Sequence, residues 1–215
     1  CLLCLRLGVP TTIQQSIVSF GNVFIQRLVN SFGPAVMAAF TVGSRIENYL
    51  FVPAIGFNIG LANFTGQNIG AQRFDRVRRG CRSTLFVTFA VAVVLELLSY
   101  VFAEQISLLF GVEGEALALS MSYVRFMSFF FWIFALYMVF VGTLQGAGDV
   151  MFTTVCSLTA LVVRVAFAYS MVGLFHWDCS AVWTGMPIGW GCSLLLSLGR
   201  FLSGKWKNKG VIDFE

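Results

Sequence analysis

The sequence predicts an all-α fold: a polytopic membrane helix bundle of six transmembrane helices. Hydrophobic residues make up 58% of the chain and charged residues 11%, whereas a soluble domain usually carries about a quarter charged residues. Six apolar stretches reach about 20 residues each, the length of helix that crosses a hydrocarbon core of roughly 30 Å. Basic loops alternate with loops that lack basic residues, which indicates an even number of spans. Lipid is therefore expected to cover most of the surface.

Turn-forming or charged residues separate the predicted spans. In chain order, the breaks are a Gly-Pro turn, a Gly- and Arg-rich loop, an acidic loop, a Gly-rich turn and a His-Asp loop, at residues 31–34, 66–80, 104–115, 142–149 and 175–180. The spans are expected over residues 10–30, 36–64, 83–103, 117–141, 151–174 and 181–202. Residues 10–202 thus form one bundle, with the end of a cytoplasmic linker at residues 1–9 and a basic cytoplasmic tail at residues 203–215.

Basic residues in the loops predict the orientation, because cytoplasmic loops hold the excess of Lys and Arg. Ten basic residues fall on one side, namely Arg6, Arg73, Arg76, Arg78, Arg79, Arg82, Arg200, Lys205, Lys207 and Lys209. The opposite loops hold acidic residues and His176. We therefore expect a multi-pass protein of the cell (inner or plasma) membrane with both ends of this chain in the cytoplasm. The arginine cluster is interpreted as a topology signal that touches anionic lipid, and no nucleic-acid partner is expected.

Four polar residues of the first span share one helical face. Gln15, Ser19, Asn22 and Gln26 are spaced by 4, 3 and 4 residues, close to the period of an α-helix. Polar side chains at membrane depth face the bundle interior or water, because hydrocarbon does not solvate them. Two interpretations remain open: these residues line a substrate or ion pathway, or they hydrogen-bond to neighbouring helices.

The second span carries two further pathway candidates, Glu47 and Asn58. They are eleven residues apart and so share a face. Pro53 lies between them and removes one backbone hydrogen bond, which predicts a kink or hinge. Tyr137, in the fourth span, is the last of the pathway candidates.

Five charged residues lie at similar depth, about 7 to 11 residues from the outer end of their spans: Arg45, Glu47, Glu96, Arg125 and Arg164. An unpaired charge inside a membrane is costly, so we expect these side chains to form an interior ionic network. The network has a structural interpretation and a functional one. In the functional hypothesis, Glu47 exchanges protons while a substrate or ion moves.

Glycines cluster at two predicted cytoplasmic turns. Gly146 and Gly148 are expected to allow a tight turn after the fourth span, because glycine adopts backbone conformations closed to other residues. Pro10 is expected to mark the start of the first span. No phosphate-binding loop is expected at the glycines, since no Lys-Ser/Thr pair follows them.

Several local patterns, taken in order, resemble the second six-helix half of multidrug and toxic compound extrusion (MATE) transporters, a family of the multidrug/oligosaccharidyl-lipid/polysaccharide flippase superfamily. They are residues 7–10 (LGVP), 38–40 (AAF), 67–71 (QNIGA) and 142–149 (GTLQGAGD), together with Arg164 and Trp183. The resemblance extends over about residues 7–190 in the expected order.

The resemblance implies one lobe of a twelve-helix transporter, with a missing N-terminal six-helix half as partner. It further implies export of drugs or small organic cations by a rocking-bundle mechanism, coupled to antiport of Na⁺ or H⁺. Some family members carry a carboxylate midway along the first helix of this half, where this chain has residues 17–19 (IVS). This departure leaves the coupling ion unassigned.

Other functions were weighed against efflux. A flippase for lipid-linked precursors, from the same superfamily, and a non-transporting six-helix membrane scaffold remain alternatives. An enzyme is not expected, because the single histidine lies in a loop and no nucleophile has a base at helical spacing. We accordingly expect no catalytic residues, no metal site and no cofactor other than the coupling ion.

Overall fold

Helices make up the structure throughout the described part of the chain. The computed structural model describes the backbone of residues 2–209 and the side chains of residues 12 and 16–207. Within these residues there are seven α-helices and one 3-10 helix, and no strand: α1 (Leu2–Asn30), α2 (Pro34–Gly70), α3 (Phe74–Val101), α4 (Ala103–Leu109), α5 (Gly114–Gly146), α6 (Val150–Phe175), α7 (Ser180–Leu202) and η1 (Lys205–Lys209). The all-α membrane bundle predicted from the sequence is confirmed.

Four of these helices, α3, α5, α6 and α7, are long and apolar enough to cross a membrane by length and composition. With 29 and 37 residues, α1 and α2 also exceed the length needed for roughly 30 Å of hydrocarbon. However, neither helix is among the four candidate spans, and α2 includes the charged residues Arg45 and Glu47. The count of six spans therefore stays a prediction for α1 and α2.

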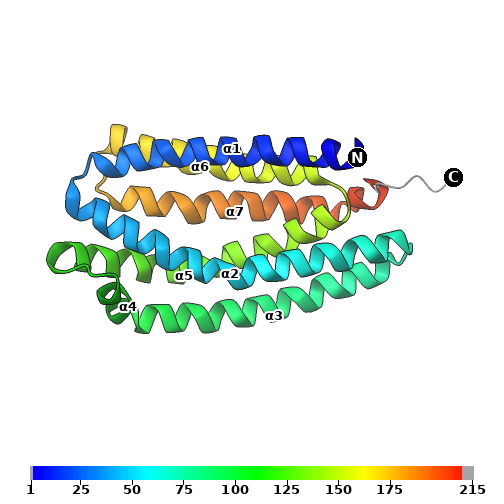
Figure 1. Cartoon of the computed structure of the whole chain (residues 1–215), viewed down its shortest axis with the longest axis horizontal. Coiled ribbons are helices and arrows are strands. Elements are labelled where there is room, and N and C mark those ends of the chain that lie inside the picture. The colour runs from blue at the N-terminus through cyan, green and yellow to red at the C-terminus, as the bar shows by residue number, and fades with distance from the viewer. Residues whose placement is uncertain (1, 210–215) are drawn as a thin grey trace.

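The helices run lengthwise along the bundle, and α5 occupies its centre, in contact with α2, α3 and α7 (Figure 1). On one side of the bundle, α1 packs mainly on α6, which in turn packs on α7. Along the other edge lies α3. The start of α1, the α2–α3 and α5–α6 turns and η1 all lie at one end (Figure 1), so the predicted basic segments share that end.

Two predicted loops are largely helical. The Gly- and Arg-rich break at residues 66–80 shrinks to a turn at residues 71–73, in which Gln72 has a positive φ of 55°. Exposed arginines start α3 instead, because helix-forming side chains can extend a helix beyond the membrane into water. The acidic break at residues 104–115 contains α4, whose buried Ser107 shares a 3.0 Å hydrogen bond with Ser120 of α5.

The first helix also begins earlier than predicted. Because α1 starts at Leu2, the expected linker at residues 1–9 is continuous with the first span from residue 2 onward. Pro10 therefore lies within the helix rather than at its start, and its side chain is outside the described residues.

Gly146 borders the predicted turn but does not lie within it. It ends α5 as a helical residue, and a Cβ built on it would collide with the backbone oxygen of Ala62 in α2. One turn earlier, a Cβ on Gly142 would lie 2.5 Å from the backbone oxygen of Asn58. The absence of side chains at both positions therefore lets α2 and α5 approach closely. Gly148, with a φ of 82°, does occupy the turn, as predicted.

Small residues also hold α7 against α6. A Cβ on Gly189 would lie 2.6 Å from the backbone oxygen of Ala160. One turn further along α7, the Ser193 hydroxyl donates a 2.6 Å hydrogen bond to the carbonyl of Cys156. This close packing holds α6 in place along its length, including the segment around Arg164.

At the end of the bundle that carries the basic segments, η1 folds under the helices. Trp206 is fully buried, stacks on Phe201 and donates its indole N–H to the Phe201 carbonyl at 3.0 Å. Beside it, Arg200 Nε of α7 lies 2.6 Å from the carboxylate of Asp149, which precedes α6. The predicted basic tail is thus ordered against the bundle at residues 205–207, and the ion pair joins the α5–α6 turn to α7.

Replacing Asp149 by asparagine is expected to lower the free energy of unfolding by about 2 kcal/mol, because a buried charge-assisted hydrogen bond is lost. The carboxylate is only 4% exposed, so water does not compensate fully for the loss. Unfolding of the full-length protein in mixed detergent micelles would measure the change. Asp75→Asn, at an exposed carboxylate in the first turn of α3, is the matched control and should cost less than about 0.5 kcal/mol. Equal losses of unfolding free energy in the two variants would show that the ion pair between Asp149 and Arg200 does not stabilise the fold.

Candidate functional site

A buried carboxylate, Glu47, marks the interior of the bundle where α2, α5, α6 and α7 meet. The spacing of buried residues along α2 places Glu47 on the face that packs against α5. Its Oε2 atom accepts a 2.9 Å hydrogen bond from the hydroxyl of Tyr123. Tyr123 belongs to α5 and is fully buried. The carboxylate therefore accepts a hydrogen bond from α5, donated by a residue that lies 76 positions further along the chain.

Aromatic side chains fix the position of Tyr123. Its ring packs edge-on against Phe40, with 5.9 Å between centroids, and against Trp183, with 5.5 Å. Space for the ring depends on Gly43, where a Cβ would collide with it. The hydroxyl also lies 3.6 Å from the sulfur of Met186. These contacts hold the phenol against Glu47 inside an apolar shell.

Arg164 of α6 supplies the positive charge of the site. It interacts electrostatically with both Glu47 and Tyr123, although no ion pair within 4 Å joins it to Glu47 among the described residues. Two buried atoms, Oε1 of Glu47 and Nε of Arg164, lack hydrogen-bond partners in the described part of the chain. Buried polar atoms without partners are uncommon and usually indicate a bound water or ion, or a second arrangement of the site.

The two oxygens of the Glu47 carboxylate differ in their hydrogen bonding. One carboxylate oxygen is held by Tyr123 and the other is free of protein donors, so the carboxylate keeps acceptor capacity. The described residues contain no group of three or more His, Cys, Asp or Glu that could bind a metal ion. The site thus consists of one buried carboxylate with an unused acceptor atom, a tyrosine donor and the nearby positive charge of Arg164.

The predicted network of five charges is not formed. Only Glu47 and Arg164 come together. Arg45 is exposed, and Arg125 is exposed as well, with its guanidinium 5.6 Å from the centre of the Tyr100 ring. Glu96 is half-buried between α3 and α5 and accepts a 2.5 Å hydrogen bond from the backbone N–H of Trp132. Rotation about the helix axes turns Arg45 and Arg125 outward, whereas Glu96 lies against α5 and not near Arg164.

The polar face of α1 is open. Ser19, Asn22 and Gln26 are all exposed, and Gln26 donates a 2.9 Å hydrogen bond to Asn30 of its own helix. In the described part of the chain, no hydrogen bond joins the side chain of Asn22 or Gln26 to another helix. The side chain of Gln15, which completes this face in the sequence, lies outside the described residues.

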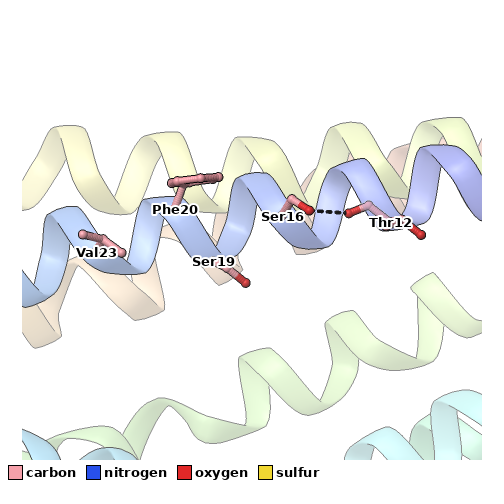
Figure 2. Close-up of a pocket in the computed structure, with 5 residues that line it drawn as sticks. All are labelled: Thr12, Ser16, Ser19, Phe20 and Val23. Carbon is pink, nitrogen blue, oxygen red and sulfur yellow. Dashed lines mark hydrogen bonds between the residues drawn. The ribbon is translucent and has the colours of Figure 1, made fainter.

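A shallow groove of about 400 Å³ runs along α1, lined by Thr12, Ser16, Ser19, Phe20 and Val23. Figure 2 shows Ser19 and Phe20 pointing to opposite sides of the helix, while Ser16 donates a 3.0 Å hydrogen bond to the carbonyl of Thr12. Three hydroxyl residues thus line one part of this surface, and two apolar side chains line the part that follows along α1. Such a surface can contact a partly apolar, partly polar molecule.

The remaining pathway candidates pack inside the bundle. Asn58 shares the α5-facing side of α2 with Glu47 and donates a 2.8 Å hydrogen bond to the carbonyl of Met138. Tyr137 is buried in α5, with Ser157 of α6 as hydrogen-bond partner. Both contacts join helices. Pro53 lies within α2, which changes direction about midway along its length (Figure 1).

Sequence reasoning missed Tyr123. The residue lies two positions before Arg125, and its importance follows from a contact with Glu47 that no local pattern records. One signal was present: Tyr123 shares a helical face with Met127, Phe131 and Phe134, which are all buried. A tyrosine on an otherwise apolar buried face requires a hydrogen-bond partner.

Comparison with known proteins agrees with this architecture. A model of the MatE family matches residues 10–170. The probable multidrug resistance protein YoeA of Bacillus subtilis (strain 168) is 31% identical over 211 residues, which are 98% of this chain and 45% of that protein. The probable multidrug resistance protein NorM of Thermotoga maritima is 24% identical over 212 residues, 98% of this chain and 46% of that protein. The chain therefore spans about half the length of the curated relatives it matches.

Solved structures share the fold. A crystal structure of MATE in the bent conformation has a TM-score of 0.86 and 22% identity, covering 98% of this chain and 47% of that one. A MOP superfamily transporter from Pyrococcus furiosus has a TM-score of 0.87 and 18% identity, covering 94% and 45%. These likenesses extend over a half of each protein. Because the family match also covers well over half of this helical membrane chain, the chain belongs to the MatE family.

Proposed function

We propose that this chain is one lobe of a secondary active efflux transporter, which exports drugs or small organic cations across the cell membrane in exchange for H⁺ or Na⁺. Curated relatives that carry the name multidrug resistance protein support the substrate class. The relatives are about twice as long as this chain. The part of them that this chain does not contain would be an N-terminal half, which would form the second lobe. Both ends of residues 1–215 would face the cytoplasm, since the basic segments lie at one end of the bundle.

The buried carboxylate of Glu47 is the observation that carries the coupling proposal. It lies where four helices meet, and its Oε1 atom has no hydrogen-bond partner in the described residues. An ion or proton bound there would change the charge next to Arg164 and Tyr123. Because α2, α5 and α6 each supply one of these groups, binding would alter the balance of contacts between helices.

The polar face of α1 supports a substrate pathway next to the second lobe. Asn22 and Gln26 are exposed on this lobe, next to a groove in which Ser19 lies with the apolar side chains of Phe20 and Val23. In transporters built from two repeats, substrates bind between the repeats near the middle of the membrane, and the repeats rock about that site. We assign Ser19, Asn22 and Gln26 to this surface.

Replacing Glu47 by glutamine is expected to abolish coupling. Glutamine retains the size of the side chain and an oxygen that can accept from Tyr123, but it carries no exchangeable charge. In proteoliposomes that contain the full-length protein, efflux of a cationic dye should respond to an imposed H⁺ or Na⁺ gradient in the wild type. In the Glu47→Gln variant, this response should fall at least about tenfold, to the level of empty vesicles.

Glu96→Gln is the matched control, because this carboxylate is also within a membrane helix but lies between α3 and α5. The control should keep most of the gradient response. A Glu47→Gln protein that still responds fully to either gradient would overturn the assignment of Glu47.

The same vesicles distinguish the alternative functions. If the wild type moved lipid-linked precursors instead of the dye, the proposed function would change from efflux transporter to flippase. Absence of both activities would favour a scaffold.

A further inference from the structure

Two arginines and two phenylalanines form one stripe on the outer face of α3. Arg78, Arg82, Phe86 and Phe89 follow each other at spacings of 4, 4 and 3 residues, and all four side chains are exposed. This helix lies along an edge of the bundle (Figure 1), so its outer face is not covered by another described helix. The stripe therefore passes from charge to hydrocarbon within about three helical turns.

A groove of about 600 Å³ lies on this stripe. Arg82 and Ser83 form its polar end, and Leu85, Phe86, Val87 and Phe89 line the rest. The ring of Phe89 packs edge-on against Trp132 of α5, with 6.4 Å between centroids. The apolar end is thus supported by a second helix, while the polar end lies next to the exposed start of α3.

No ion pair neutralises the positive charge at the polar end within the part of the chain that the structure describes. Residues 73–82 contain five arginines and a single acidic residue, Asp75. Among the described residues, the one ion pair that the structure records joins Arg200 to Asp149 and involves none of these arginines. Arg82 is therefore accessible to an anion from outside the described residues.

We propose that this groove binds an anionic phospholipid of the cytoplasmic leaflet. Its phosphate lies at Arg82 and Ser83, with Arg78 one turn above, and an acyl chain follows Phe86 and Phe89. The charge of the site fits the headgroup, and the apolar wall continues into the hydrocarbon-facing surface of a helix that is apolar enough to span the membrane. A soluble phosphate would use the arginine but leave the phenylalanines in contact with lipid tails, so the amphipathic lipid matches the whole groove.

Titration of the detergent-solubilised full-length protein with phosphatidylglycerol, followed by native mass spectrometry, tests this site. The first phosphatidylglycerol should bind more tightly than the first phosphatidylcholine. The Arg82→Ala variant should lower phosphatidylglycerol affinity about fivefold, which corresponds to one basic residue near an anionic surface. Arg82→Lys should recover most of this loss, because the charge is retained.

Arg76→Ala is the matched control: it removes an equally exposed arginine of the same helix that lies off the stripe. It should change phosphatidylglycerol affinity less than about twofold. Equal losses for Arg82→Ala and Arg76→Ala would overturn the proposal in favour of diffuse attraction by the whole cluster. Displacement of the bound lipid by glycerol phosphate at equal concentration would also overturn it, since the acyl chain would then contribute nothing.

Discussion

Replacing Arg164 by methionine is expected to lower the free energy of unfolding by about 2–3 kcal/mol, because the buried carboxylate of Glu47 loses the positive charge that a half-buried arginine places near it. Methionine retains much of the apolar stem of the side chain, so packing against α7 changes little. Glu47 then stays buried with Tyr123 as its single donor. Equilibrium unfolding of the full-length protein in mixed micelles would measure the loss.

The double variant Glu47→Leu with Arg164→Met separates pairing from packing. Because it removes both charges, it should recover about 2 kcal/mol or more of the single-variant loss. Arg45→Met and Arg125→Met are matched controls, since both arginines are exposed, and each should cost less than about 1 kcal/mol. The pairing would be disproved if Arg164→Met cost no more than these controls, or if the double variant lost as much as the two single variants together.

The contrast between Arg164 and Arg125 shows how far sequence reasoning reaches at this site. Depth along a span follows from counting residues, and it placed Glu47 and Arg164, which interact electrostatically in the structure, in the same layer. The direction in which each charged side chain points depends on the rotation of its helix about the helix axis. That rotation is set by packing against helices that come from elsewhere in the chain. Helical spacing could separate Arg45 from Glu47, two residues apart, but nothing local indicates that Arg125 points toward Tyr100.

The fold was predictable to a greater extent than the site. Hydrophobic length and loop composition identified five of the long helices to within a few residues at most ends, because membrane solvation imposes these features on any sequence. Helix ends in water were less predictable: α3 begins at Phe74 rather than near residue 83. Polar helical turns satisfy their backbone groups equally well outside the membrane, so composition does not mark the boundary.

Glycine illustrates a second limit. Gly148 and Gly146 belong to the same glycine-rich segment, and both suit a turn. Only the structure distinguishes a glycine needed for its positive φ from one needed for the absence of a side chain. The distinction rests on α2, about 80 residues earlier in the chain, whose backbone faces Gly142 and Gly146.

Adding a single methyl group at these contacts is therefore expected to separate α2 from α5. Gly142→Ala and Gly146→Ala should each lower the free energy of unfolding by about 1–3 kcal/mol, because the new Cβ meets backbone atoms that cannot rotate away. Gly142→Ala should also weaken the hydrogen bond from Asn58 to the Met138 carbonyl, one turn away on α5. The same micelle unfolding experiment would report both losses.

Gly60→Ala provides the control, because it adds the same methyl group to α2 where nothing lies within 4 Å. There the change should be neutral or stabilising by up to about 1 kcal/mol, since alanine restricts the unfolded chain more than glycine does. If Gly142→Ala and Gly60→Ala gave the same stability, the helices would not be in backbone contact. The close approach that aligns Glu47 of α2 with Tyr123 of α5 would then need another cause.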